Sequence, residues 1–156
     1  PLAEGSAAAL LPENYLKRVR DDFERKTGKL LDLTRMNKIL LFDEDLGEAV
    51  VEPGVTIRQL WRYSIERRHW PMVVPGTMEV TCGGAAAMNI HGKNNFRVGT
   101  FGDNVLEFDM LLPCGDLRTC NRQQNADLFH AAIGGLGSST GAILGGLLLG
   151  FALLAV

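Results

Sequence analysis

The sequence predicts one α+β domain, in which a small mixed sheet is flanked by helices. Three observations lead to this prediction. The chain has 156 residues, the size of a single domain. Short apolar segments alternate with segments of helical periodicity, and clusters of turn residues separate them. Apolar residues make up 46% of the chain and charged residues 22%, which is the composition of a globular protein with a real core.

The charge balance and the cysteines exclude several classes of function. The 16 Lys and Arg residues and 18 Asp and Glu residues are interspersed, so the chain offers no basic surface for nucleic acid. Cys82, Cys114 and Cys120 form no CxxC pair, and no Cys/His spacing resembles a zinc site, so we expect no metal. Reduced thiols in the cytoplasm are the favoured state, although Cys114 and Cys120 flank a turn where a disulfide is possible.

The N-terminal segment, residues 1–28, is atypical. Its first part is small and apolar without clear periodicity, whereas residues 12–26 carry apolar side chains at helical spacing. Gly28 is suited to ending this helix. We expect an amphipathic helix that lies on a core.

A hairpin is predicted next. Residues 29–41 and 49–52 have the character of two short strands, and the polar residues 43–47 between them end in a glycine. Pro53 and Gly54 then stop the second strand.

A helix follows, for which Thr56 is a suitable N-cap. Its apolar side chains form one stripe at helical spacing, which we interpret as core packing. They are Ile57, Leu60, Trp61 and Ile65.

The character of the chain changes after Trp70. Most of the 18 glycines lie beyond residue 75, and residues 75–105, which follow a short predicted strand at Met72–Val74, combine Gly, Asn and Thr with few charges. Glycine lets a backbone come within contact distance of a ligand, and successive exposed amides form a concave site suited to phosphate. The alternative that the residues leave open is a run of β-turns in a scaffold.

The C-terminal third predicts a second hairpin, a short helix and an apolar tail. Residues 105–112 and 117–120 are the strands, and Asn125 is placed to cap the helix that follows. The glycines at 134–137 lack the preceding strand that a dinucleotide-binding Rossmann motif requires. The tail, residues 144–156, is shorter than the ~20 residues needed to cross a bilayer. It is a buried strand or an incomplete membrane segment.

Four stretches carry a resemblance to a known family. They are VVEPGVTIRQLW, PMVVPGTMEVTCGGAAAMNIHGKN, GTFGDNVLEFDMLLPCGDLRTC and ADLFHAAIGGLG. In order and spacing they resemble the FAD-linked oxidases of the vanillyl-alcohol oxidase / para-cresol methylhydroxylase superfamily, and the second stretch most resembles the decaprenylphosphoryl-ribose oxidase branch. The similarity covers residues 29–143. It implies an incomplete FAD-binding domain of the vanillyl-alcohol oxidase type, with FAD as the cofactor.

The resemblance also implies which residues bind the cofactor. In the family, the segments that match Gly76-Thr77 and Thr81–Gly84 wrap the pyrophosphate and ribityl chain, the segment matching Met88–His91 passes along the isoalloxazine, and a residue matching Ile143 touches the adenine side. Close backbone approach is expected at the two adjacent glycines and hydroxyl hydrogen bonds at the two threonines. The expected set is Gly76, Thr77, Thr81, Cys82, Gly83, Gly84, Met88, Asn89, Ile90, His91 and Ile143.

His91 and Lys93 are the expected catalytic residues, because in related enzymes the HGK motif borders the cavity where substrate meets flavin. We expect His91 to orient a substrate hydroxyl or to hydrogen-bond the flavin, and Lys93 to supply positive charge for a phosphate-bearing substrate. Without the motif the pair fits a solvated turn equally well. His69 and His130 are expected to be structural. The implied reaction oxidises an alcohol of a small molecule, such as a sugar or a polyprenyl-phosphate sugar, by hydride transfer to FAD.

Two departures from the family pattern keep other hypotheses open. The RGxGxSYGD-type loop that members carry before the first strand cannot be aligned here, and after residue 143 the chain turns apolar where members continue into a substrate domain. We therefore expect non-covalent FAD and an incomplete active site. The alternatives are a truncated, non-catalytic remnant with weak or no flavin binding, and an interaction protein whose apolar tail makes membrane contact, which would place a cytoplasmic protein at a membrane.

Overall fold

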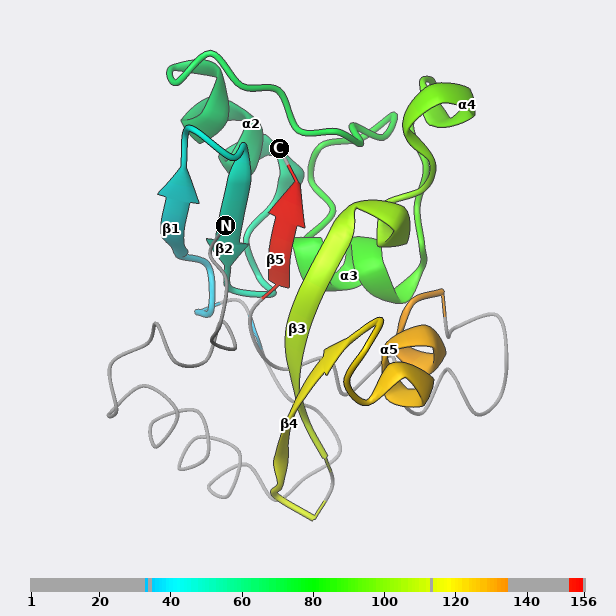
Figure 1. Cartoon of the computed structure of the whole chain (residues 1–156). Coiled ribbons are helices and arrows are strands. Elements are labelled where there is room, and N and C mark those ends of the chain that lie inside the picture. The colour runs from blue at the N-terminus through cyan, green and yellow to red at the C-terminus, as the bar shows by residue number, and fades with distance from the viewer. Residues whose placement is uncertain (1–32, 34, 113, 135–151, 156) are drawn as a thin grey trace.

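The computed structural model describes residues 33, 35–112, 114–134 and 152–155, which form a five-stranded sheet with helices packed against it (Figure 1). The strand order is β1-β2-β5-β3-β4, and every ladder between the described strands is antiparallel. The α+β class is confirmed. The mixed strand directions that we expected are not found, because β1 with β2 and β3 with β4 are joined by short turns that impose antiparallel pairing. The helix predicted over residues 12–26 lies outside the described residues.

The first hairpin joins β1 (Ile39–Asp43) to β2 (Glu48–Val51). Its turn is closed by the Asp43 carboxylate, whose Oδ1 accepts hydrogen bonds from the amides of Asp45 and Leu46 at 2.9 and 3.0 Å. The hairpin was predicted correctly, but its first strand is shorter than expected. Residues 35–38 form no strand, because the amide of Met36 closes a turn onto the Leu33 carbonyl at 2.9 Å.

The second hairpin joins β3 (Val105–Leu111) to β4 (Leu117–Asn121), as predicted. Its turn is closed by a hydrogen bond of 2.8 Å from the Leu112 amide to the Asp116 carbonyl. All three cysteines are free, so the possible Cys114–Cys120 disulfide is not formed. Cys120 belongs to the buried core, whereas Cys114 is exposed on the turn.

The described end of the apolar tail is β5 (Ala152–Ala155), which lies in the middle of the sheet. It pairs antiparallel with β2 on one side and with β3 on the other, and Leu154 is only 2% exposed. We had two interpretations of the tail, a buried strand and an incomplete membrane segment, and these residues form the buried strand. Among the described residues, no helix combines the length and the apolar character that crossing a membrane requires.

Helix α2 (Ile57–Ile65) begins as the sequence predicts. The Thr56 hydroxyl accepts from the Gln59 amide, and the Gln59 side chain accepts from the Thr56 amide, which makes a complete capping box. The predicted apolar stripe is only partly buried. Ile57 and Leu60 are in the core, but Ile65 is 42% exposed, because Ser64 instead faces inward in the last turn.

The remaining helices are short: α3 (Cys82–Ala87), α4 (Asn95–Val98), the 3₁₀ turn η2 (Gly102–Asn104) and α5 (Ala126–Ala132). Two local predictions were wrong here. Met72–Val74 forms no strand. Pro75 follows it directly, and the Met72 carbonyl accepts a hydrogen bond from the Asn94 side chain instead of from a neighbouring strand. Asn125 precedes α5 in a left-handed conformation, and its side chain bonds the Thr119 carbonyl at 2.7 Å rather than capping the helix.

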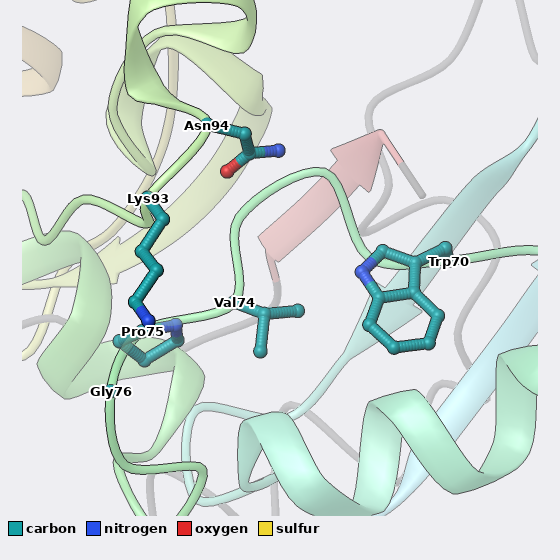
Figure 2. A pocket seen from close by; sticks show the side chains of 6 residues that line it. All are labelled: Trp70, Val74, Pro75, Gly76, Lys93 and Asn94. Atoms are coloured by element: carbon teal, nitrogen blue, oxygen red, sulfur yellow. The ribbon is translucent and has the colours of Figure 1, made fainter.

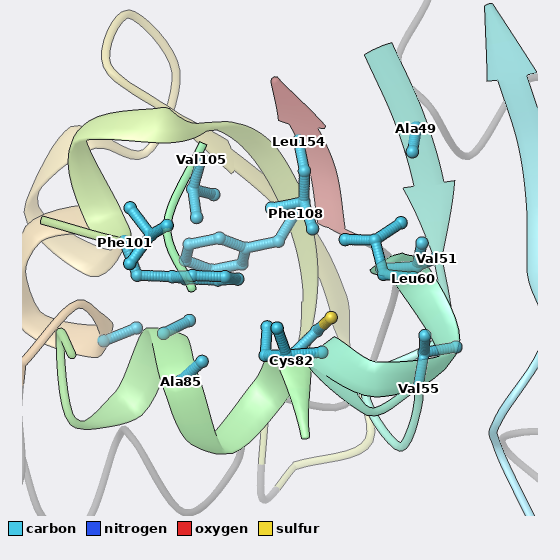
Figure 3. Packing of buried hydrophobic residues seen from close by; sticks show 14 of the residues in the cluster. Ala49, Val51, Val55, Leu60, Cys82, Ala85, Phe101, Val105, Phe108 and Leu154 are labelled. Atoms are coloured by element: carbon cyan, nitrogen blue, oxygen red, sulfur yellow. The ribbon is translucent and has the colours of Figure 1, made fainter. Parts of the chain in front are cut away.

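The core lies between one face of the sheet and helices α2, α3 and α5 (Figure 3). The cross-strand register brings Ala49 opposite Leu154 and Phe108 opposite Cys120, so these buried side chains share that face. Phe108 stacks on Phe129 of α5 with ring centroids 5.2 Å apart. Helix α3 contributes mainly alanines, and their small side chains let its backbone approach the aromatic layer closely.

The position of β5 makes a prediction about stability. Leu154→Ala should lower the free energy of unfolding by about 2–5 kcal/mol, because it removes a buried side chain from the central strand. The matched control is Leu46→Ala, at a turn position that is 43% exposed, which should change it by less than about 1 kcal/mol. Urea denaturation measures both, and equal effects would contradict the central placement of β5.

Candidate functional site

Two loops meet at an open pocket of about 400 Å³ (Figure 2). One loop follows Trp70 and carries the PGT motif, and the other follows α3 and carries HGKN. The pocket thus brings together Gly76 and Lys93, which the sequence assigned to one site. Figure 2 shows the Lys93 side chain extending toward Pro75. The complete lining is Trp70, Val74, Pro75, Gly76, Lys93 and Asn94.

Direct contacts hold the two loops together. The Asn94 amide group donates to the Met72 carbonyl at 3.1 Å. Gly92 packs on the other loop so closely that a Cβ atom there would lie 2.8 Å from the Val74 carbonyl oxygen. The pocket is therefore a product of the fold and not of loose surface turns.

The amides at the start of α3 are used within the fold. Those of Cys82 and Gly83 donate to the carbonyls of Val55 and Pro53 at 2.7 and 2.9 Å, and that of Gly84 donates to the Thr81 hydroxyl at 3.2 Å. We expected Gly83 and Gly84 to present bare amides to a ligand, and these amides are already paired. A Cβ on Gly83 would lie 2.9 Å from the Pro53 Cβ, so the chain itself requires this glycine.

The amides of the PGT loop are placed differently. No partner among the described residues bonds the amides of Gly76, Thr77 and Met78. A Cβ on Gly76 would meet nothing within 4 Å, and this glycine has no positive φ that would explain it. Packing therefore does not account for the glycine, whereas close approach of a ligand would.

The hydroxyls of Thr77 and Thr81 each accept one backbone hydrogen bond, from Glu79 at 3.4 Å and from Gly84 at 3.2 Å. Because a hydroxyl also has one proton to donate, both side chains keep a donor for a ligand. The acid of the loop, Glu79, is paired with Arg58. Within the described residues Lys93 has no such partner, so the charge at the pocket is positive.

The segment from Met88 to His91 divides into exposed and structural residues. The side chain of Met88 is 57% exposed and His91 is also exposed. Asn89 accepts a hydrogen bond from the Gly102 amide, and Ile90 packs against the core while its carbonyl accepts from the Phe101 amide. Ile143 lies outside the described residues.

The other two histidines and the two buried cysteines have their surroundings within the fold. The ring Nδ1 of His69 lies 2.8 Å from the Arg67 carbonyl, and His130 packs edge-on against Phe129. Burial raises the pKa of Cys82 to about 12. Burial, with a smaller contribution from the carboxylates of Asp109 and Glu107, raises the pKa of Cys120 to about 11. Both thiols stay protonated near neutral pH, so Cys82 contributes to a site only through its backbone. In the described part of the chain, no three acidic, His or Cys side chains gather as a metal site.

The return loop behind the HGKN motif is also fixed. The Asp103 carboxylate accepts from the Thr100 amide and hydroxyl at 2.7 and 2.8 Å, and these bonds lower the pKa of Asp103. Two residues of this region were not predicted from the sequence. They are Trp70, which lines the pocket, and Arg122, whose guanidinium donates hydrogen bonds to the carbonyls of Gly102, Asp103 and Val105. For Trp70 the only available signal was an aromatic residue directly before Pro71, and no pattern indicated Arg122.

A family model described as "FAD binding domain" matches residues 17–121 of this chain. The chain belongs to this family of FAD-binding domains. Decaprenylphosphoryl-beta-D-ribose oxidase of Mycolicibacterium smegmatis is 32% identical over 143 residues, which is 91% of this chain and 31% of that protein. Cytokinin dehydrogenase 2 of Arabidopsis thaliana is 29% identical over 70% of this chain and 22% of its own length. The chain thus spans about a third or less of these curated relatives.

Solved structures agree on the fold. A carbohydrate oxidase from Microdochium nivale superposes with a TM-score of 0.63 at 21% identity, over 79% of this chain and 24% of its own. An alkyldihydroxyacetonephosphate synthase superposes with a TM-score of 0.64, also at 21% identity, over 80% of this chain and 22% of its own. The family match and the 32% identical relative confirm the expected resemblance to FAD-binding oxidoreductases, with FAD as the cofactor of the family.

The different surroundings of Gly76 and Gly83 make a prediction that needs no ligand. Gly83→Ala should lower the free energy of unfolding by about 1–3 kcal/mol, because the added methyl group meets the rigid Pro53 ring. Gly76→Ala is the matched control and should leave stability unchanged or raise it by less than about 1 kcal/mol. Chemical denaturation of the ligand-free chain measures the free energy of unfolding of each variant. Equal stability of the two variants would contradict the packing role of Gly83.

Proposed function

We propose that this chain binds FAD non-covalently through the PGT loop and serves an oxidoreductase that oxidises an alcohol, with a sugar hydroxyl as the substrate group. The observation that carries the proposal is the set of amides at Gly76, Thr77 and Met78, which have no partner among the described residues and lie beside a glycine that packing does not require. Membership of the FAD-binding domain family supports the identity of the ligand.

The donors of the loop suit a diphosphate. Backbone amides and the hydroxyls of Thr77 and Thr81 donate hydrogen bonds without bringing a fixed negative charge, and the nearby Glu79 is neutralised by Arg58. A concave row of amides binds phosphate without Arg or Lys. Gly83 and Gly84 support this loop by fixing the start of α3, and on this proposal they are not phosphate ligands.

The residues of the HGKN motif are proposed to face the reacting side. FAD, when bound, supplies an acceptor for the hydride that leaves the alcohol carbon. The exposed His91 makes no side-chain hydrogen bond to a described residue, so its imidazole is available to accept a hydrogen bond from the substrate hydroxyl and to orient that carbon. Met88 is exposed on the same segment and offers an apolar surface to a ring.

Lys93 suggests the class of substrate. Its ammonium group lines the pocket with the exposed Trp70, so a negatively charged ligand with an apolar or planar portion would satisfy both. The name of the 32% identical relative refers to a phosphorylated ribose, which combines a sugar hydroxyl with such a charge. We therefore propose a phosphate-bearing sugar, free or linked to a polyprenyl chain.

The proposal predicts a specific effect of Gly76→Val. The side chain would project from the loop into the space that the ligand needs, so FAD affinity should fall at least about tenfold while stability is kept. Quenching of flavin fluorescence on titration with the chain measures the affinity. The control is Gln123→Val, an exposed position in another loop, which should bind FAD like the unmodified chain.

Two outcomes would contradict the proposal. Equal affinity of Gly76→Val and the unmodified chain would show that the PGT loop does not contact FAD. Absence of FAD binding by the unmodified chain would favour the non-catalytic remnant instead.

A further inference from the structure

The place of His91 depends on its backbone, because its side chain has no hydrogen-bond partner among the described residues. The segment before it is clamped against η2 by two bonds. The Ile90 carbonyl accepts from the Phe101 amide at 2.8 Å, and the Asn89 side chain accepts from the Gly102 amide at 2.9 Å. His91 is the first residue to leave this clamp.

Asn89 is built into the clamp by its conformation as well as by its hydrogen bond. Its φ of 44° lies in the left-handed region, which Asn tolerates better than most residues. Its side chain lies between two glycines. A Cβ on Gly102 would come within 2.8 Å of Asn89 Oδ1, and one on Gly134 within 3.0 Å of Asn89 Cβ. Three segments, from the ends of α3 and α5 and from η2, therefore meet on this one side chain.

Arg122 bonds the same residue, Gly102, at its carbonyl group. Its guanidinium donates to the carbonyls of Gly102 and Asp103 at 3.0 and 3.1 Å and to that of Val105 at 2.8 Å. It also lies over the Phe129 ring, 5.2 Å from the ring centre. Gly102 thus donates a hydrogen bond from its amide to Asn89 and accepts one at its carbonyl from Arg122. A movement of either side chain would therefore disturb Gly102 and, through it, the other side chain.

We infer that Asn89 and Arg122 are positioning residues, which act through Gly102 to fix the backbone from which His91 reaches the bound substrate or flavin. This inference rests on the proposed function for the role of His91. It also gives Asn89 a role different from the cofactor contact that the family resemblance implied, because its side-chain oxygen is already bonded within the fold.

The test compares two substitutions of one residue. Asn89→Gly permits the left-handed backbone but removes the acceptor, whereas Asn89→Asp keeps an acceptor and tolerates the same φ. In the ligand-free chain, Asn89→Gly should speed hydrogen exchange of the Phe101 and Gly102 amides about fivefold to tenfold and shift the His91 amide and imidazole resonances. Asn89→Asp should leave the two amide exchange rates within about twofold of their values in the unmodified chain. The Cys82 amide, bonded to Val55, is the internal control and should keep its rate in both variants.

A second variant separates positioning from general stability. Arg122→Lys keeps the charge but loses the fork that reaches three carbonyls, and it should shift the same His91 resonances. With FAD bound, Asn89→Gly and Arg122→Lys should also change the visible flavin spectrum, whereas a purely structural role would lower the melting temperature and leave the spectrum of the folded protein unchanged.

Unshifted His91 resonances in both Asn89→Gly and Arg122→Lys would overturn the inference, as would an unaltered flavin spectrum in both. If the unmodified chain fails to bind FAD, the proposed function is lost. The resonance and exchange measurements, which need no ligand, then decide the positioning of His91 by themselves.

Discussion

The hydrogen bonds from the Cys82 and Gly83 amides to the carbonyls of Val55 and Pro53 organise the rest of this domain. They join the start of α3 to the turn between β2 and α2, two places that the glycine-rich loop would otherwise leave independent. Because Gly83 has no side chain, the helix sits directly on Pro53 and its alanines reach the aromatic core. The PGT loop then crosses the surface with its own amides unpaired by any described residue.

This arrangement separates two uses of glycine within one motif. At Gly83 the missing side chain allows backbone to meet backbone inside the protein, and the resulting hydrogen bonds stabilise the fold. At Gly76 the missing side chain leaves open space. The proposed binding of FAD needs both, because a loop can present amides to a diphosphate only if other bonds hold that loop in place.

Local patterns could be predicted from the sequence, and long-range ones could not. The Asp43 turn and the Thr56 capping box were readable because the residues that make them lie within a few positions of one another. The insertion of β5 between β2 and β3 depends on pairing between residues far apart in the sequence, such as Ala49 with Leu154 and Val105 with Leu154. The apolar pattern of the tail does not specify which residues pair. The PGT and HGKN motifs located the pocket, but sequence alone could not separate the structural Gly83 from the open Gly76.

In our proposal, the fold uses the amides at the start of α3 and leaves those of the PGT loop for FAD. The most direct measurement is an amide-resolved NMR titration of the ¹⁵N-labelled chain with FAD. We expect the largest shifts at Gly76, Thr77 and Met78, with saturation, and small shifts at Cys82 and Gly83. Shifts concentrated at Cys82 and Gly83, with the PGT loop unaffected, would contradict it.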